Sequence, residues 1–188
     1  MPDGGMHAAA CATLDRFRAE HGIDGRYDDT PTWPFRIGPV TVPVPNFSWR
    51  RRAIQRHDIH HLVTGYPFNM RGEFQVATWE FAAGCYPHAG ATLLILPLVF
   101  LGLFWSPPEV WRAFLDGRRS RSLYRPEFGD HALHASWEDL LRNMRRESAS
   151  HRASMADRIA FLWIVLQSMA LVATPIAAIV ALLTLIQP

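Results

Sequence analysis

The sequence contains no lysine. All 19 basic side chains among its 188 residues are arginines. We attribute this bias mainly to genomic base composition, although a guanidinium also pairs with carboxylates and phosphates better than an ammonium does. The 17 acidic residues leave a formal net charge of only +2. So small a charge gives no indication of a nucleic-acid-binding surface, and we expect no nucleic acid among the partners.

Cysteine is scarce, and motifs for organic cofactors are missing. Cys11 and Cys85 lie too far apart to form a local metal or redox pair, and they provide no disulfide framework, which fits a reducing compartment. The sequence has neither a G-x-G-x-x-G pattern nor a phosphate-binding P-loop. Its first ten residues contain no basic segment followed by an apolar one, so we expect no cleaved signal peptide.

Charge is also missing from residues 159–186, a run longer than the roughly 20 residues that cross a bilayer as a helix. Pro175 lies inside it, so we expect either a kinked membrane-spanning helix or a re-entrant hairpin. Arginines gather before this run, which by the positive-inside tendency places the main domain in the cytoplasm. A second apolar run, residues 91–105, is too short to span and is expected to be a buried or lipid-skimming helix.

The remaining sequence favours an all-α fold with three parts: an N-terminal extension (1–26), a helical metal-binding domain (27–152) and the C-terminal membrane segment (153–188). Further helices are expected at residues 8–20, 49–64, 73–83, 109–115 and 137–150. Ser48 and Ser136 are candidate N-caps, and Gly22, Gly65 and Gly84 are candidate helix ends. Five prolines between residues 27 and 46 predict an extended arm with at most one short strand, 37–44. We expect a turn at Asp116-Gly117 and a polar loop over 118–130.

The centre of the sequence, residues 57–73, holds the best candidates for a metal site. On a helix, His57 and His61 project from one face, a common way to present two imidazoles to one divalent cation. Asp58 can add an oxygen ligand or orient a ring. A Gly/Pro/Asn-rich turn returns the chain so that Glu73 faces the first helix. Zinc, iron and manganese all suit such donors, and a pair of surface histidines remains the simpler alternative.

Neighbouring residues extend this site. Glu80 lies two turns after Glu73 on the same helix face and is expected to support the metal ligands without binding the ion itself, whereas His60 is expected to point away. The arginines at positions 50–52 are expected to anchor the domain on anionic lipid head groups.

The pattern His57-Asp58-x-x-His61, followed by eleven residues and Glu73, resembles the signature of the ubiquinone (coenzyme Q) biosynthesis protein 4 family. Residues 62–65 (L-V-T-G), Pro67, Asn69-Met70 and Gly72 agree with that signature. Weaker similarity continues through the apolar run, Asp116-Gly117-Arg118 and Trp137-Glu138, so the resemblance covers roughly residues 27–150. The C-terminal apolar segment is an addition to the family pattern.

The resemblance implies a mostly helical fold and a divalent metal, zinc first, held by His57, Asp58, His61 and Glu73. It implies oxidative decarboxylation, with hydroxylation at the same ring carbon, of a polyprenylated hydroxybenzoate at the membrane. We therefore expect this quinone precursor, membrane lipid and other quinone-biosynthesis enzymes as partners, in a homo-oligomer at a bacterial inner membrane. Arg71 or Arg56 could meet the substrate carboxylate, and the apolar helix its prenyl tail.

Three alternatives compete with this interpretation. The first is a non-catalytic, lipid-binding assembly factor for quinone enzymes, which would have a closed metal site instead of an open coordination position. A membrane desaturase would need about eight histidines in three boxes, but only His131 and His134 hint at a second group. A metal phosphohydrolase would need further distant ligands.

Overall fold

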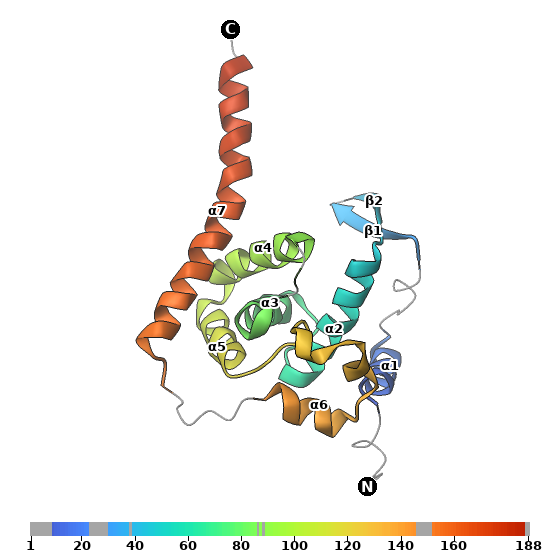
Figure 1. Cartoon of the computed structure of the whole chain (residues 1–188). Helices are drawn as coiled ribbons and strands as arrows, with labels where there is room; N and C mark the ends of the chain where they lie inside the picture. The colour runs from blue at the N-terminus through green and yellow to red at the C-terminus, as the bar shows by residue number, and fades with distance from the viewer. Residues whose placement is uncertain are drawn as a thin grey trace.

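The computed structural model describes residues 9–22, 30–37, 39–85, 87, 89–145 and 152–186, and within them it confirms a mostly helical chain. Helix α3 (Met70–Gly84) lies at the centre. Helices α4 (Ala89–Trp105) and α5 (Pro107–Arg118) pack on one side of it, and α2 (Ser48–Thr64) on another (Figure 1). The site described below lies between α2 and α3, so the packing of this pair determines its geometry.

A tight turn joins α2 to α3. Gly65 ends α2 with a φ of 73°, as expected, in the left-handed region that favours glycine. The Asn69 side chain caps α3 by accepting a hydrogen bond from the Gly72 amide at 3.0 Å. Gly72 packs so closely on the turn that an added Cβ would lie 1.7 Å from the Pro67 carbonyl oxygen. The proposed Ser48 cap is wrong, because α2 already begins at Ser48 and Phe47 takes the cap position.

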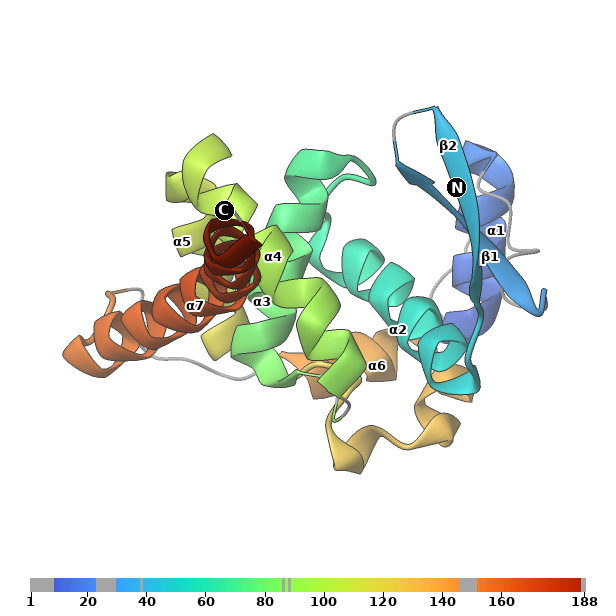
Figure 2. The ribbon, with the colours of Figure 1, turned by 90° about the horizontal axis from the view of Figure 1, so that it is seen from above.

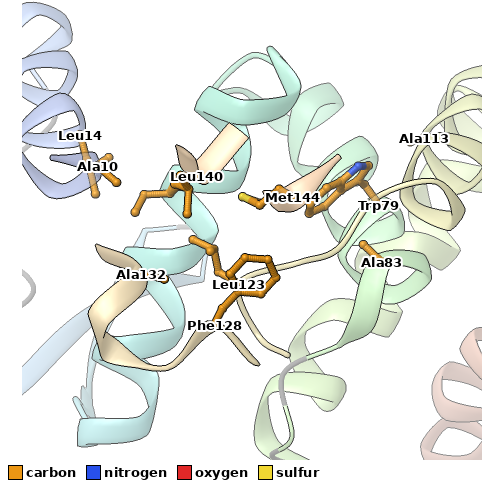
Figure 3. Close-up of a cluster of buried hydrophobic side chains, with 11 residues drawn as sticks. Ala10, Leu14, Trp79, Ala83, Ala113, Leu123, Phe128, Ala132, Leu140 and Met144 are labelled. Atoms are coloured by element: carbon orange, nitrogen blue, oxygen red, sulfur yellow. The ribbon is translucent and has the colours of Figure 1, made fainter. Parts of the chain in front are cut away.

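The main hydrophobic core lies where α2 and α3 meet the two ends of the chain's globular part (Figure 3). Helix α1 (Ala10–His21) contributes Ala10 and Leu14, and α6 (Trp137–Met144) contributes Leu140 and Met144. Met144 lies next to Trp79 of α3, which is 2% exposed, and Leu140 lies between Met144 and the two side chains of α1 (Figure 3). Helix α1 therefore packs into the same core as the central helices.

The segment around α5 departs from the sequence-based expectations. Helix α5 runs through Asp116 and Gly117 to Arg118, so the predicted turn is wrong. Gly117 instead allows α5 to approach α3 closely, because a Cβ there would lie 2.4 Å from the Trp79 carbonyl oxygen. The following segment, expected to be a polar loop, forms two 3₁₀ turns, η2 (Pro126–Phe128) and η3 (Asp130–His134), and buries Leu123 and Phe128.

Helix α6 starts as predicted and ends earlier. The Ser136 side chain accepts a hydrogen bond from the Asp139 amide at 3.1 Å, which confirms the N-cap. The helix stops at Met144, because Arg145 leaves it to pair with Ser120 in an isolated antiparallel bridge. The predicted extension toward residue 150 is thus wrong at residue 145, and residues 146–151 lie outside the described part of the chain.

The proline-rich arm forms two strands where at most one was expected. Strands β1 (Thr32–Ile37) and β2 (Val40–Pro45) pair as an antiparallel hairpin beside the N-terminal end of α2 (Figure 2). Pro34 lies opposite Pro43 in the register. In a two-stranded sheet each strand has a free edge, so a residue without an amide hydrogen can be accommodated there.

Helix α7 (Met155–Ile186) is one continuous helix with Pro175 inside it, so the hairpin alternative is wrong. Its span Met155–Thr184 is long and apolar enough to cross a membrane. The first half packs on α4 and α5, where Ile164 is buried, and the second half extends beyond the domain (Figures 1 and 2). Both α7 and α4 carry exposed apolar side chains, and Trp105 at the end of α4 is 80% exposed.

Candidate metal centre

Three side chains from α2 and α3 meet at one point. His57 Nε2 lies 3.3 Å from His61 Nε2 and 3.1 Å from Glu73 Oε2, and His61 Nε2 lies 3.3 Å from Glu73 Oε1. The helical i, i+4 spacing aligns the two rings, and the tight turn returns Glu73 to face them. His57, His61 and Glu73 form a group that could hold a metal ion.

The outer ring nitrogens determine which atoms face the centre. His61 Nδ1 lies 3.0 Å from the Tyr66 carbonyl oxygen, which can only accept, so Nδ1 carries the proton and donates. His57 Nδ1 likewise donates to the Glu80 carboxylate at 2.9 Å. In their neutral forms both rings therefore direct Nε2 lone pairs inward. A histidine bound to a metal usually has this arrangement, with its second nitrogen donating to a carboxylate or carbonyl.

The spacing of the donors fits a small cation. Ligands on a tetrahedral ion with bonds of about 2.0–2.1 Å lie about 3.3–3.4 Å apart, close to the separations found here. Two lone pairs and a carboxylate at such distances repel one another unless a proton or a cation lies among them. The chemistry of the donor set therefore fits a divalent metal, without choosing which one.

The electrostatics of the ion-free group lead to the same conclusion. Burial would lower the pKa of His57, but the Glu80 and Glu73 carboxylates outweigh it and hold this pKa well above 6.5. Burial would raise the pKa of Glu80, but His57 and His60 outweigh it and lower the pKa to about 2. The pKa of Glu73 is also lowered, against burial, by His57 and His61. A buried carboxylate, Glu80, and a half-buried one, Glu73, beside the two imidazoles make a site with affinity for positive charge.

Asp58, the fourth predicted ligand, does not join this group. Its carboxylate accepts a hydrogen bond from Arg18 Nε of α1 at 3.1 Å and forms an ion pair with the same guanidinium. Burial is the main reason that the pKa of Asp58 is raised, and Arg18 opposes the shift. Asp58 thus joins α1 to α2, and three donors remain at the centre.

Glu80 lies beside the donors, where its Oε1 accepts a hydrogen bond from His57, and the expectation that His60 points away from the site is wrong. Both side chains are fully buried, and His60 Nδ1 donates to Glu80 Oε1 at 2.6 Å. His60 Nε2 accepts a hydrogen bond from the Leu123 amide at 2.9 Å. His60 therefore fixes the carboxylate that orients His57.

The two arginines expected to face the substrate lie elsewhere. Arg71 is largely exposed and forms an ion pair with Glu109 of α5. Arg56 is buried and pairs with Asp130 of η3 at 2.6 Å. Neither side chain is among those that line the cavity beside the metal donors.

That cavity has a volume of about 280 Å³ and is lined by two of the three donors, His57 and Glu73, together with aromatic and apolar side chains. His57, Glu73 and Glu80 line one side, and Ile95 and Leu98 of α4 line another. The remaining lining comes from the hairpin, α2 and the segment after α5, namely Trp33, Trp49, Arg50, Ala53, Ile54 and Tyr124. A pocket with few polar groups among apolar and aromatic ones is typical of a small-molecule site.

Comparison with known proteins finds a partial similarity to one curated protein. This chain is similar to a ubiquinone biosynthesis protein. The relative is "Ubiquinone biosynthesis protein COQ4, mitochondrial" from Yarrowia lipolytica (strain CLIB 122 / E 150), 26% identical over 91 residues. The match covers 48% of this chain and 32% of the relative, about a third of the relative's length. No family model and no solved structure matches the chain.

Sequence reasoning missed several residues of this site. Tyr66 acts through its carbonyl oxygen, which leaves no trace in the side-chain pattern. His60 lies on the same face of α2 as Ala53 and Arg56, which are seven and four positions earlier in the helix. All three side chains are buried. The cavity residues Trp33 and Arg50 come from the arm and from the start of α2, and only tertiary structure brings them to the donors.

Proposed function

We propose that the protein acts in ubiquinone biosynthesis at a membrane, as a metal-dependent oxidative decarboxylase of a polyprenylated hydroxybenzoate. In this reaction the ring carboxyl leaves as carbon dioxide and a hydroxyl replaces it on the same carbon. The exchange is a net two-electron oxidation and needs an external oxidant. The similarity to the Yarrowia protein supports the pathway, and the three-donor centre beside a cavity supports the chemistry.

The observation that carries this proposal is the number of donors. Catalytic zinc sites use three protein ligands and keep a further position for water or substrate, whereas structural sites use four protein ligands. The Asp58 carboxylate is directed to Arg18, so His57, His61 and Glu73 remain as the donor set beside the cavity. This arrangement favours the enzyme over a non-catalytic assembly factor, which remains the second candidate.

A divalent ion held by His57, His61 and Glu73, zinc first, would supply a positive charge that polarises a phenolic oxygen and stabilises negative charge on the ring. Glu80 and the Tyr66 carbonyl hold the two imidazoles in the required tautomer. Trp33 and Trp49 provide flat apolar surfaces for a ring and exclude water from it. Ile95 and Leu98 lead toward the exposed apolar face of α4, which suits a polyprenyl tail.

Helix α7 supplies the membrane part of the proposal. Its span Met155–Thr184 would anchor the domain in the bilayer, and the arginines before it favour a cytoplasmic domain. The exposed apolar side chains of α4, including Phe104 and Trp105, would then lie at the membrane surface.

The test is the metal content of the purified protein and of its His61→Ala and Glu73→Ala variants, together with quinone precursors extracted from strains carrying each. We expect both variants to lose the ion and to accumulate a carboxylated prenyl-ring precursor. His131→Ala, on an exposed turn, is the control and should change neither. Loss of the ion with a normal quinone profile would show that the protein is not this enzyme. Retention of the ion would contradict the ligand assignment.

A further inference from the structure

The walls of the cavity carry opposite charges. Glu73 and Glu80 lie on one side with His57, while Arg50 lines another part of the same cavity. Arg50 lies at the start of α2 and belongs to the three arginines that were expected to contact lipid head groups. In the structure its side chain faces Trp33 of the hairpin, with the guanidinium carbon 4.3 Å from the ring centroid.

The contacts of Arg50 hold its guanidinium in place. Arg50 Nη1 donates to Asn46 Oδ1 at 2.9 Å. Asn46 is only 4% exposed, and its own amide groups donate to the Thr30 and Pro31 carbonyl oxygens, both at 2.9 Å. A guanidinium stacked on an indole and tied to a buried asparagine loses little freedom when it binds an anion, so more of the interaction energy is available for binding.

The rest of the lining defines the shape of an accepted ligand. Trp33 and Trp49 offer flat surfaces, and Ile95 and Leu98 form an apolar side on α4. At about 280 Å³ the cavity is at the lower end of the range for ligand pockets, enough for a head group but too small for a long lipid. A fitting ligand therefore has an aromatic ring, an anionic group and an apolar chain that leaves along α4.

We propose that Arg50 binds the carboxylate of the aromatic acid, so that the ring spans the cavity with its phenolic side toward His57, His61 and Glu73. This inference rests on the proposed function and adds a substrate-binding residue to it. Arg50 lines this cavity, and neither Arg56 nor Arg71 is among its lining residues. The planar fork of Arg50 suits a carboxylate, to which it donates charge-assisted hydrogen bonds.

The test compares binding of two probes to the full-length, zinc-loaded protein in detergent: 3-geranyl-4-hydroxybenzoate and 2-geranylphenol, which lacks only the carboxylate. We expect Arg50→Gln to weaken binding of the acid on the order of 10- to 100-fold and to leave binding of the phenol unchanged. Arg50→Lys should restore part of the loss. Arg52→Gln, an exposed arginine on the same helix, is the matched control and should change neither probe.

The outcomes separate this inference from the proposed function. If the unaltered protein binds the acid and Arg50→Gln binds it equally well, Arg50 is not the carboxylate partner although the function stands. If Arg50→Gln weakens acid and phenol alike, the residue is merely structural and the inference fails. If the unaltered protein binds neither probe, both proposals fail. Geranyl phosphate is the third probe, and Arg50-dependent binding of this ligand without the acid would assign the site to a phosphate.

Discussion

Replacing Glu80 by glutamine tests the metal centre with the smallest change in shape. The substitution removes the negative charge from the buried group that accepts hydrogen bonds from His57 Nδ1 at 2.9 Å and His60 Nδ1 at 2.6 Å. A hydrogen bond to a charged group contributes about 1.5–3 kcal/mol and a neutral one about 0.5–1.5 kcal/mol. The His57 bond should therefore weaken by about 1–1.5 kcal/mol, which corresponds to roughly tenfold in zinc affinity.

Proton release gives an independent readout of the same change. The Glu80 and Glu73 carboxylates raise the folded, metal-free pKa of His57, so zinc has to displace a proton from a larger fraction of the rings than it would at an unperturbed histidine. Zinc affinity should consequently rise with pH until the pH exceeds the folded pKa of His57. Glu80→Gln lowers this pKa, because it removes one of the charges that raise it, and fewer protons should then be released at pH 7.

The assay is a competition titration with a chromophoric chelator, with calorimetry in two buffers of different ionisation enthalpy to count the protons. Glu127→Gln is the matched control, because this glutamate lies on the surface and pairs with Arg125 at 3.3 Å. Unchanged zinc affinity and unchanged proton release in Glu80→Gln would refute the conclusion that Glu80 orients His57.

Three further predictions concern stability and membrane attachment. Without metal, the free energy of unfolding should fall as the pH drops below 4.5, because Glu73 and Glu80 take up protons more readily in the unfolded chain. The stabilising contribution of His57 is complete below pH 6.5 and is lost as the pH rises through its folded pKa. Melting curves measured with chelator from pH 3 to 9 should therefore show a maximum in stability between these limits, and a flat profile would contradict the pKa shifts. Gly117→Ala should destabilise the protein by about 1–3 kcal/mol, because the new Cβ would meet the Trp79 carbonyl oxygen. A melting temperature equal to that of the unaltered protein would refute the close approach of α5 to α3. The double substitution Ala173→Arg and Ala177→Arg should release the protein from membranes in a flotation assay, because each charge costs about 2.5–3.5 kcal/mol at the centre of a spanning helix. The control Ala156→Arg, near the start of α7, should leave the protein on the membrane. Retention of the double variant would argue against a membrane-spanning helix.

The parts of the site that sequence could predict depend on local geometry. His57 and His61 share a face because of the helical period, and Glu73 returns because Gly65 ends one helix and Asn69 caps the next. These constraints act within residues 57–73, so the pattern of the chain contains them.

Interactions between distant segments were not predictable in this way. Asp58 looked like a ligand because it stands beside His57, but its partner Arg18 comes from α1, forty positions away. The inward orientation of His60 involves a hydrogen bond from the Leu123 amide, which belongs to the segment after α5. The hairpin escaped prediction because prolines argue against strands in general, while an edge position removes the objection.

Helix α4 borders both the cavity and helix α7, and this position has a kinetic consequence. Its residues Ile95 and Leu98 form a wall of the cavity, and the same helix packs against α7. A chain anchored through α7 would hold the cavity at a fixed depth next to the bilayer, so a lipid-borne ligand would reach it by diffusion in two dimensions at a high effective concentration. Release of the anchor should therefore slow the encounter with long-chain ligands while leaving short, soluble ones unaffected.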